Sequence, residues 1–225
     1  TQQFCPACTR LGIEEKKAST LSKSLECIKL AKTFKVFEKE SIISEELKEA
    51  SLDNFKSDSH HDMKAIEFTK RMCRHYYSGG SGNTIFSGPP GVGKSHLSMA
   101  MAKILNDTFN KCDEPHSMIF IPVARMISQI KGSFNGRGEY TEDYAIKLLS
   151  NVDFLFLDDI GKESSMSNQI KAASDWVQGI LFNILDARNK TIINTNFSRD
   201  ELLKIYDSAL VDRICLLYTS DAADE

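Results

Sequence analysis

One stretch of the chain has the residue types and spacing of a phosphate-binding loop. Between a short apolar run at 84–86 and a helical pattern that starts at residue 95 lies the sequence Gly88-Pro89-Pro90-Gly91-Val92-Gly93-Lys94-Ser95. Its glycines let successive backbone N–H groups turn toward phosphate oxygens, and the start of the helix adds partial positive charge. We therefore predict that this loop and the adjoining His96 bind ATP. Lys94 is expected to contact the β- and γ-phosphates, and Ser95 is expected to bind Mg²⁺.

Two carboxylates follow a second apolar run. Residues 152–157 have the composition of a buried strand, and Asp158 and Asp159 come directly after it. In a parallel sheet this strand would end at the same edge as the glycine loop. We predict that Asp158 holds Mg²⁺ through water and that Asp159 orients or deprotonates the attacking water. A solvated Asp-Asp turn at the end of a strand is the alternative.

A polar amide follows a third apolar run. Residues 191–195 are expected to form a strand, and Asn196 comes next. Its amide could position the lytic water against the γ-phosphate. Ser198 precedes an acidic first helical turn and is predicted to cap that helix. Water positioning is predicted for Asn196 and helix capping for Ser198, so both predictions can be correct.

The elements around these motifs alternate. Strands are expected at 84–86, 117–123, 152–157 and 191–195, and helices at 62–77, 95–109, 124–130, 142–149, 169–188, 199–206 and 209–214. This alternation predicts an α/β fold with a parallel sheet covered by helices on both faces. A whole strand lies between the glycine loop and the two carboxylates. We therefore expect the P-loop NTPase branch in which another strand intervenes in the sheet (ASCE), as in motor-like and AAA+ ATPases.

Four strings occur in a characteristic order and spacing: Gly-Pro-Pro-Gly-Val-Gly-Lys-Ser-His-Leu, Phe-Leu-Phe-Leu-Asp-Asp-Ile-Gly, Ile-Ile-Asn-Thr-Asn-Phe and Leu-Val-Asp-Arg-Ile. Over roughly residues 50–214 the chain resembles the AAA+ helicase loaders of bacteria and their phages, the DnaC/DnaI type. The resemblance implies an ATPase of low intrinsic rate that loads a replicative DnaB-type hexameric helicase onto single-stranded DNA. A transposition helper like the related ATPase IstB is the main alternative. An adaptor whose nucleotide site only stabilises the fold and a small-molecule kinase are the others.

The same resemblance assigns further features. Arg213 matches the arginine finger that reaches the ATP of a neighbouring subunit, which implies self-association. From the residues alone, Arg213 would be a surface or capping arginine. The family's later sensor 2 arginine has no counterpart in these 225 residues.

The N-terminal residues Cys5-Pro6-Ala7-Cys8 have the spacing of half a zinc knuckle. The DnaI-type loaders carry an N-terminal zinc-binding domain that grips the helicase. The resemblance therefore implies Zn²⁺ in the intact protein, with further ligands before Thr1. Two free cysteines in a turn are the alternative. An amphipathic helix expected at 14–40 would pack on its own domain or on the partner helicase.

Composition narrows the choice of partners. The net charge of −3 argues against nucleic-acid binding by bulk electrostatics, so any DNA contact must be local. The candidates are Lys131, Phe134 and Arg137, for which a surface loop is the alternative. No apolar run approaches the roughly 20 residues of a membrane span. Six scattered cysteines indicate a reducing cytoplasm.

Three segments are expected. Residues 1–50 would contact the helicase, residues 51–214 would form the ATPase domain without its lid, and a linker would lie near 41–61. Residues 215–225 resemble a translated sequencing adapter, so the natural sequence is expected to end near Ile214. A short C-terminal strand is the alternative.

Overall fold

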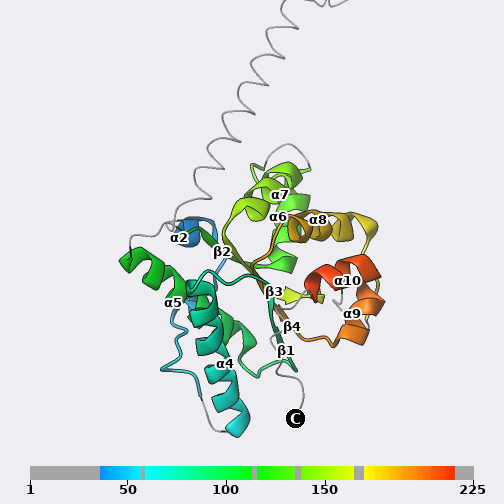
Figure 1. Cartoon of the computed structure of the whole chain (residues 1–225). Coiled ribbons are helices and arrows are strands. Elements are labelled where there is room, and N and C mark those ends of the chain that lie inside the picture. The colour runs from blue at the N-terminus through cyan, green and yellow to red at the C-terminus, as the bar shows by residue number, and fades with distance from the viewer. Residues whose placement is uncertain (1–35, 57–58, 113–115, 135–137, 165–169, 216–225) are drawn as a thin grey trace, which may run out of the picture.

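A computed structural model describes residues 36–56, 59–112, 116–134, 138–164 and 170–215 (Figure 1). In chain order the elements are α2 (Val36–Glu40), α3 (Glu45–Lys48), α4 (His60–Tyr77), β1 (Thr84–Ser87), α5 (Lys94–Lys111), β2 (Met118–Pro122), α6 (Val123–Ser133), α7 (Glu142–Asn151), β3 (Phe154–Ile160), the 3₁₀ turn η1 (Lys162–Ser164), α8 (Asp175–Asp186), β4 (Thr191–Thr195), α9 (Arg199–Ile205) and α10 (Ser208–Ile214).

The four strands form one parallel sheet in the order β1-β4-β3-β2. The predicted α/β fold is therefore confirmed. So is the expectation that another strand separates the glycine-loop strand from the carboxylate strand. The intervening strand is β4, while β2 lies at the edge of the sheet beyond β3. All four strands end at the edge where the glycine loop begins.

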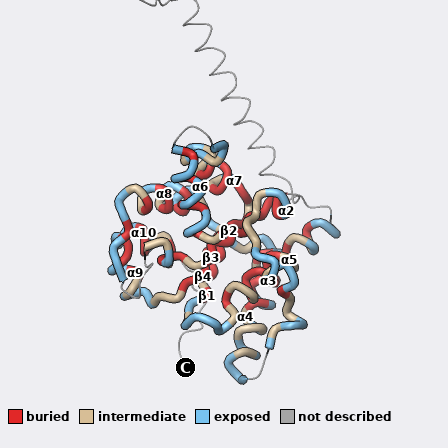
Figure 2. Tube along the Cα trace, turned by 180° about the vertical axis from the view of Figure 1, so that it is seen from behind, coloured by how far each residue is buried: buried red, intermediate tan, exposed pale blue. Residues whose placement is uncertain are grey.

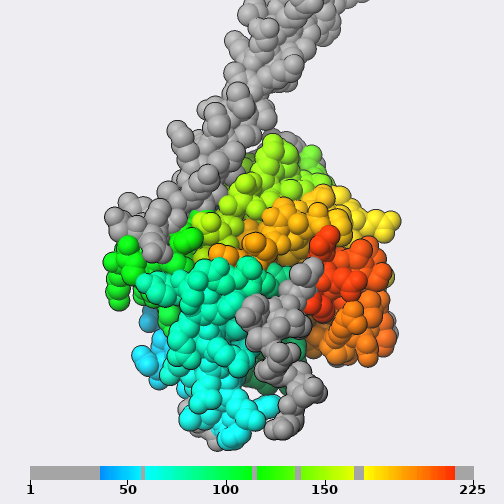
Figure 3. Space-filling view, viewed as in Figure 1, coloured from blue at the N-terminus to red at the C-terminus, as the bar shows by residue number. Residues whose placement is uncertain are grey.

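Alternation along the strands creates two hydrophobic cores, one on each face of the sheet. Phe120 and Phe156 pack with residues of α4 and α5, whereas Ile121 and Leu157 pack with residues of α6, α7 and α8. Because successive side chains of a strand point to opposite faces, the continuous apolar runs of β2 and β3 fill both cores. Figure 2 shows the buried sheet between exposed outer helix surfaces. In Figure 3, α7 and α8 cover the top of the visible face, with α9 and α10 beside them.

Capping residues set where several helices begin. Ser198 and Glu201 form a capping box at the start of α9, which confirms the predicted cap. The helix predicted from residue 169 begins only at Asp175. Ser174 caps it there, and the preceding Ala173 N–H donates to the Ile205 carbonyl (2.8 Å). This tertiary bond and the cap together keep residues 170–174 out of the helix.

The segment expected to be a linker is packed on the ATPase core from residue 41 to residue 56. The Ile42 N–H donates to the Phe120 carbonyl (2.8 Å), and the Phe120 N–H donates to Ser41 Oγ (2.9 Å). These bonds cover the free edge of β2. The division at residue 50 remains a prediction. Of the helix expected at 14–40, only α2 lies within the described residues. No helix in the described part of the chain is long and apolar enough to cross a membrane.

Arg188 joins the ends of three elements and should be important for stability. Its Nη1 donates to the carbonyls of Leu149 (2.7 Å) and Val152 (2.6 Å), and its Nη2 donates to that of Lys190 (3.0 Å). Burial lowers the pKa of the guanidinium to about 10, so the group stays charged at neutral pH. Removing it leaves carbonyls at the end of α7 without a donor.

We predict that Arg188→Met lowers the free energy of unfolding by roughly 3 kcal/mol. Urea denaturation measures this change. Arg199→Met is the matched control, because Arg199 forms an exposed ion pair with Asp212, and should cost at most about 1 kcal/mol. Equal losses in the two variants would contradict the bridging role of Arg188.

Candidate nucleotide-binding site

The glycine loop connects β1 to α5 in the way the sequence predicts. Gly91 and Gly93 have φ values of 85° and 86°, a left-handed conformation that favours glycine, and Gly93 immediately precedes the first residue of α5. The Lys94 ammonium donates to the carbonyls of Gly88 and Pro89 (2.8 Å each). Burial lowers the Lys94 pKa, while the nearby carboxylates of β3 oppose that shift. The Lys94 side chain thus lies across the loop in which it is predicted to contact the phosphates.

Asp158 lies where β3, β4 and α5 meet, and only 6% of its surface is exposed. Its Oδ1 accepts hydrogen bonds from Ser95 Oγ and Asn194 Nδ2 (2.7 Å each). Burial raises the pKa of this carboxyl, and these two bonds work against the rise. Ser95 and Asp158, the residues predicted to bind Mg²⁺, are therefore in direct contact.

The donor set around Asp158 fits Mg²⁺, which prefers oxygen ligands and keeps several waters. A hydroxyl and a carboxylate are already together. Among the described residues, the buried Asn194 Oδ1 has no hydrogen-bond donor, so it could accept from a magnesium-bound water. Asn194 was missed in the sequence. The available signal was an amide inside an otherwise apolar strand.

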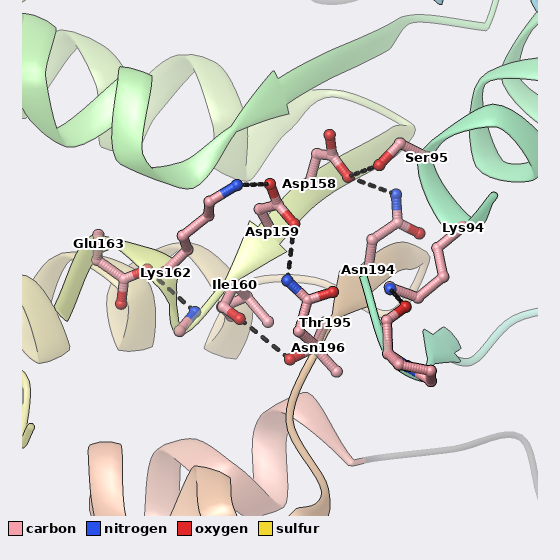
Figure 4. Close-up of polar contacts among 12 residues, drawn as sticks. Lys94, Ser95, Asp158, Asp159, Ile160, Lys162, Glu163, Asn194, Thr195 and Asn196 are labelled. Carbon is pink, nitrogen blue, oxygen red and sulfur yellow. Dashed lines mark hydrogen bonds and ion pairs between the residues drawn. The ribbon is translucent and has the colours of Figure 1, made fainter. Parts of the chain in front are cut away.

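The two neighbouring carboxylates point in different directions (Figure 4). Asp159 has a φ of 56°, and the pairing of β3 with β4 shifts register between Leu157 and Ile160. Asp158 turns toward Ser95. Asp159 turns instead toward Asn196, whose Nδ2 donates to its Oδ1 (3.4 Å), and toward Lys162, whose Nζ donates to its Oδ2 (2.9 Å). Lys162 was also missed, because nothing in its local sequence marks it.

Other loop residues differ in their surroundings. His96 faces the N-terminal segment: its Nε2 is 2.7 Å from the Ser51 carbonyl oxygen, and its ring meets the edge of Phe55, with centroids 5.3 Å apart. Phe55 also packs so closely on Gly93 that a Cβ at Gly93 would lie 2.4 Å from its ring. Four loop residues are exposed: Pro89, Pro90, Gly91 and Val92.

Arg213 lies away from the glycine loop of its own chain. Its guanidinium pairs with Asp186 (2.7 Å), and its carbonyl accepts from Asn83 Nδ2 (2.9 Å). Asn83 precedes β1 and the glycine loop follows it, so Arg213 lies toward the opposite edge of the sheet. The structure therefore does not bring Arg213 together with Lys94 and Asp159.

The remaining predicted residues fall into two groups. Phe134 is 62% exposed and its ring packs on Trp176 (centroids 5.3 Å apart), while Lys131 Nζ lies 5.6 Å from the Trp176 ring. Cys5, Cys8 and Arg137 lie outside the described residues. Within the described part of the chain, no group of three or more His, Cys, Asp or Glu side chains is placed to hold a metal ion.

The family model for IstB-like ATP-binding proteins matches residues 32–216. A curated relative, the replicative helicase loader DnaC of Buchnera aphidicola subsp. Baizongia pistaciae, is 34% identical over 145 residues. The match covers 60% of this chain and 55% of the relative, so the chain spans little more than half the relative's length.

Solved structures have the same fold. A crystal structure of the DnaC helicase loader matches with a TM-score of 0.60 and 22% identity, over 77% of this chain and 96% of that chain. A crystal structure of DnaI matches with a TM-score of 0.60 and 24% identity, over 79% and 92%. At these identities the likeness shows that this chain shares the fold of those structures.

The burial of Asp158 predicts a stability change that depends on pH. A carboxyl whose pKa is raised by folding favours the folded state below its ordinary pKa, and this contribution is lost as pH rises through the raised value. At neutral pH the charge is therefore unfavourable. Asp158→Asn keeps an oxygen for Ser95 and Asn194, and it should raise the free energy of unfolding by on the order of 1 kcal/mol at pH 7 without Mg²⁺ or nucleotide.

The gain in Asp158→Asn should shrink as pH falls through the raised pKa of Asp158, because the wild-type carboxyl then becomes protonated. Thermal unfolding at several pH values measures it, with the exposed Asp143→Asn as the control. Mg²⁺ with nucleotide should reverse the order of stability, because only the carboxylate binds the metal well. A loss of stability that is the same at every pH would contradict an unfavourable buried charge at Asp158.

Proposed function

The chain belongs to the family of IstB-like ATP-binding proteins, and from this premise we propose that it loads a replicative hexameric helicase onto single-stranded DNA under the control of ATP. The observation that best supports the proposal is the cluster of Lys94, Ser95, Asp158, Asp159 and Asn196 at one edge of the sheet. These are the parts of an ATP-dependent switch. Curated relatives are named replicative helicase loader DnaC, and this name suggests that the switch would control helicase loading.

In this proposal ATP is hydrolysed at the glycine loop. The loop N–H groups and Lys94 would bind the phosphates. Ser95, and Asp158 through water, would hold Mg²⁺, which would neutralise phosphate charge. Asp159 accepts a proton from water as the water oxygen bonds to the γ-phosphorus. The bond from the γ-phosphorus to its bridging oxygen breaks, leaving ADP and phosphate. Asn196, already close to Asp159, positions the water.

Binding of ATP must change contacts that are present in the loop. Lys94 donates to two loop carbonyls and would exchange these bonds for phosphate oxygens. His96 and Phe55 connect the same loop to the segment that leads toward the N-terminus. We infer that the ATP-bound state binds helicase and DNA tightly and that hydrolysis releases the loader. We also propose that Cys5 and Cys8 contribute to a Zn²⁺ site, which would stabilise the segment proposed to contact the helicase.

A small aromatic surface supports contact with single-stranded DNA. Phe134 is exposed beside Trp176, and Lys131 lies over the Trp176 ring. Exposed aromatic rings stack on bases, and a neighbouring ammonium attracts phosphates. Arg137, three residues after Phe134 in the sequence, carries a further positive charge. This local surface is compatible with a chain whose net charge is negative.

The loader role predicts nucleotide-dependent complex formation. On size exclusion with the host's replicative helicase, the wild-type protein should co-elute in ATP and Mg²⁺ but not without nucleotide. Lys94→Ala should abolish co-elution, because the phosphate contact is lost. Co-elution of Lys94→Ala equal to wild type would contradict control by ATP. ATPase activity without any co-elution would favour the transposition helper.

Arg213 is proposed to act on the ATP of a neighbouring subunit. Its place toward the opposite sheet edge suits a head-to-tail assembly, in which one subunit's Arg213 faces the next subunit's loop. We predict that Arg213→Ala lowers turnover by about 10³-fold in the assembled state. Arg199→Ala, which removes a similarly exposed arginine, should leave turnover within about twofold.

Mixing variants separates action between subunits from action within one. Lys94→Ala subunits cannot bind ATP well but still carry Arg213, so adding them to Arg213→Ala should restore part of the activity. No recovery, together with turnover that does not depend on protein concentration, would show that Arg213 does not act in trans.

A further inference from the structure

Lys162 is a second cation at the proposed hydrolysis site. Its ammonium donates to Asp159 Oδ2 (2.9 Å), on the side of the carboxylate opposite the Asn196 contact (Figure 4). The ion pair raises the pKa of Lys162, so the ammonium remains charged at neutral pH. The residue assigned to accept a proton from water is thus already engaged by a positive charge.

Hydrogen bonds from other residues hold the backbone on both sides of Lys162 in place. Glu163 accepts hydrogen bonds from the Tyr206 hydroxyl and from the Gly161 N–H (3.0 Å). Thr195 Oγ1 donates to the Ile160 carbonyl (3.0 Å), which ties the same turn to β4. The Lys162 side chain itself is 60% exposed. Its ammonium can therefore leave Asp159 while the backbone stays in place.

We propose that Lys162 is a positioning residue that holds Asp159 in a resting arrangement, and that the ion pair must open before Asp159 can accept a proton from water. The inference rests on the proposed ATP hydrolysis and adds to it a local cause of a low intrinsic rate. A general base needs direct hydrogen-bonding distance to its water and a lone pair free to take the proton. An ammonium in contact with the carboxylate occupies one of its oxygens and competes with water for that position.

The strength of the Lys162–Asp159 ion pair depends on how far its two side chains are exposed to water. Ion pairs between partly exposed side chains are weak, so this pair limits Asp159 without blocking it permanently. Removing the ammonium should raise turnover by about threefold to fivefold, the range that such a pair can impose. Nucleotide affinity should change much less, because Lys94 and the loop N–H groups remain.

The test compares turnover at saturating ATP and Mg²⁺ in the full chain. Lys162→Met should be faster than wild type, while Lys162→Arg, which can keep the ion pair, should stay close to wild type. The matched control is Lys147→Met, which removes an ammonium from an exposed pair with Asp143 on α7 (2.7 Å). It should leave turnover unchanged. Affinity for a non-hydrolysable ATP analogue should stay within about twofold in all three variants.

A second measurement does not depend on hydrolysis. The ¹⁵N signal of the Lys162 ammonium, assigned by its loss in Lys162→Arg, should shift when Asp159 is replaced by Asn. It should shift in the same direction when the ATP analogue and Mg²⁺ bind to wild type. A signal that responds to neither change would overturn the inference.

The outcomes separate this inference from the hydrolysis proposal. If Asp159→Asn loses activity but Lys162→Met is no faster than wild type, the restraint by Lys162 is wrong and the role of Asp159 stands. If Asp159→Asn keeps full activity, Asp159 is not the proton acceptor. The proposed role of Asp159 and its restraint by Lys162 are then both wrong.

Discussion

The buried carboxylate of Asp158 connects the elements that form the proposed nucleotide site. Ser95 on α5 and Asn194 on β4 both donate to its Oδ1, and Asn194 also donates to Ser98 Oγ on α5 (2.6 Å). The start of α5 is thereby attached to two central strands, which fixes the glycine loop relative to the sheet. Burial of the charge is unfavourable, and these hydrogen bonds offset part of its cost. The site is therefore assembled around a group that weakens the fold when Mg²⁺ is absent.

The order of the strands makes this arrangement possible. With β4 between β1 and β3, an amide near the end of β4 lies beside the carboxylates near the end of β3. In a regular strand, consecutive side chains point to opposite faces of the sheet. At the end of β3 this alternation is interrupted, because Asp159 has a left-handed conformation and the register shifts beside it. Both carboxylates therefore lie at the same edge of the sheet, but they contact different residues. One faces the hydroxyl of Ser95, and the other faces Asn196 and Lys162.

The sequence predicts those parts of the site that local residues determine. The glycine loop, the paired carboxylates and the Ser198 cap each depend on a few neighbouring residues. The loop and the cap lie where they were expected, whereas β3 continues to Ile160, so the two carboxylates lie inside the last residues of the strand and not after it. Asn194 could not be assigned, because its contacts come from residues 36 and 96 positions away. The start of α8 was misplaced for a similar reason, since a bond from Ala173 to the distant Ile205 competes with helix formation. Long-range contacts, rather than propensity, decided both cases.

The site thus combines a fixed frame with charges that can move. Asp158 and Asn194 are buried and hydrogen-bonded, so their positions are determined by packing. Lys162 and Arg213 are partly exposed, and each forms an ion pair with a carboxylate, Asp159 and Asp186 respectively. Such pairs are weak and therefore easily exchanged for a phosphate or for a residue of another protein. A switch driven by ATP needs both properties, because the frame must recognise the nucleotide in one geometry while the mobile charges respond to its arrival.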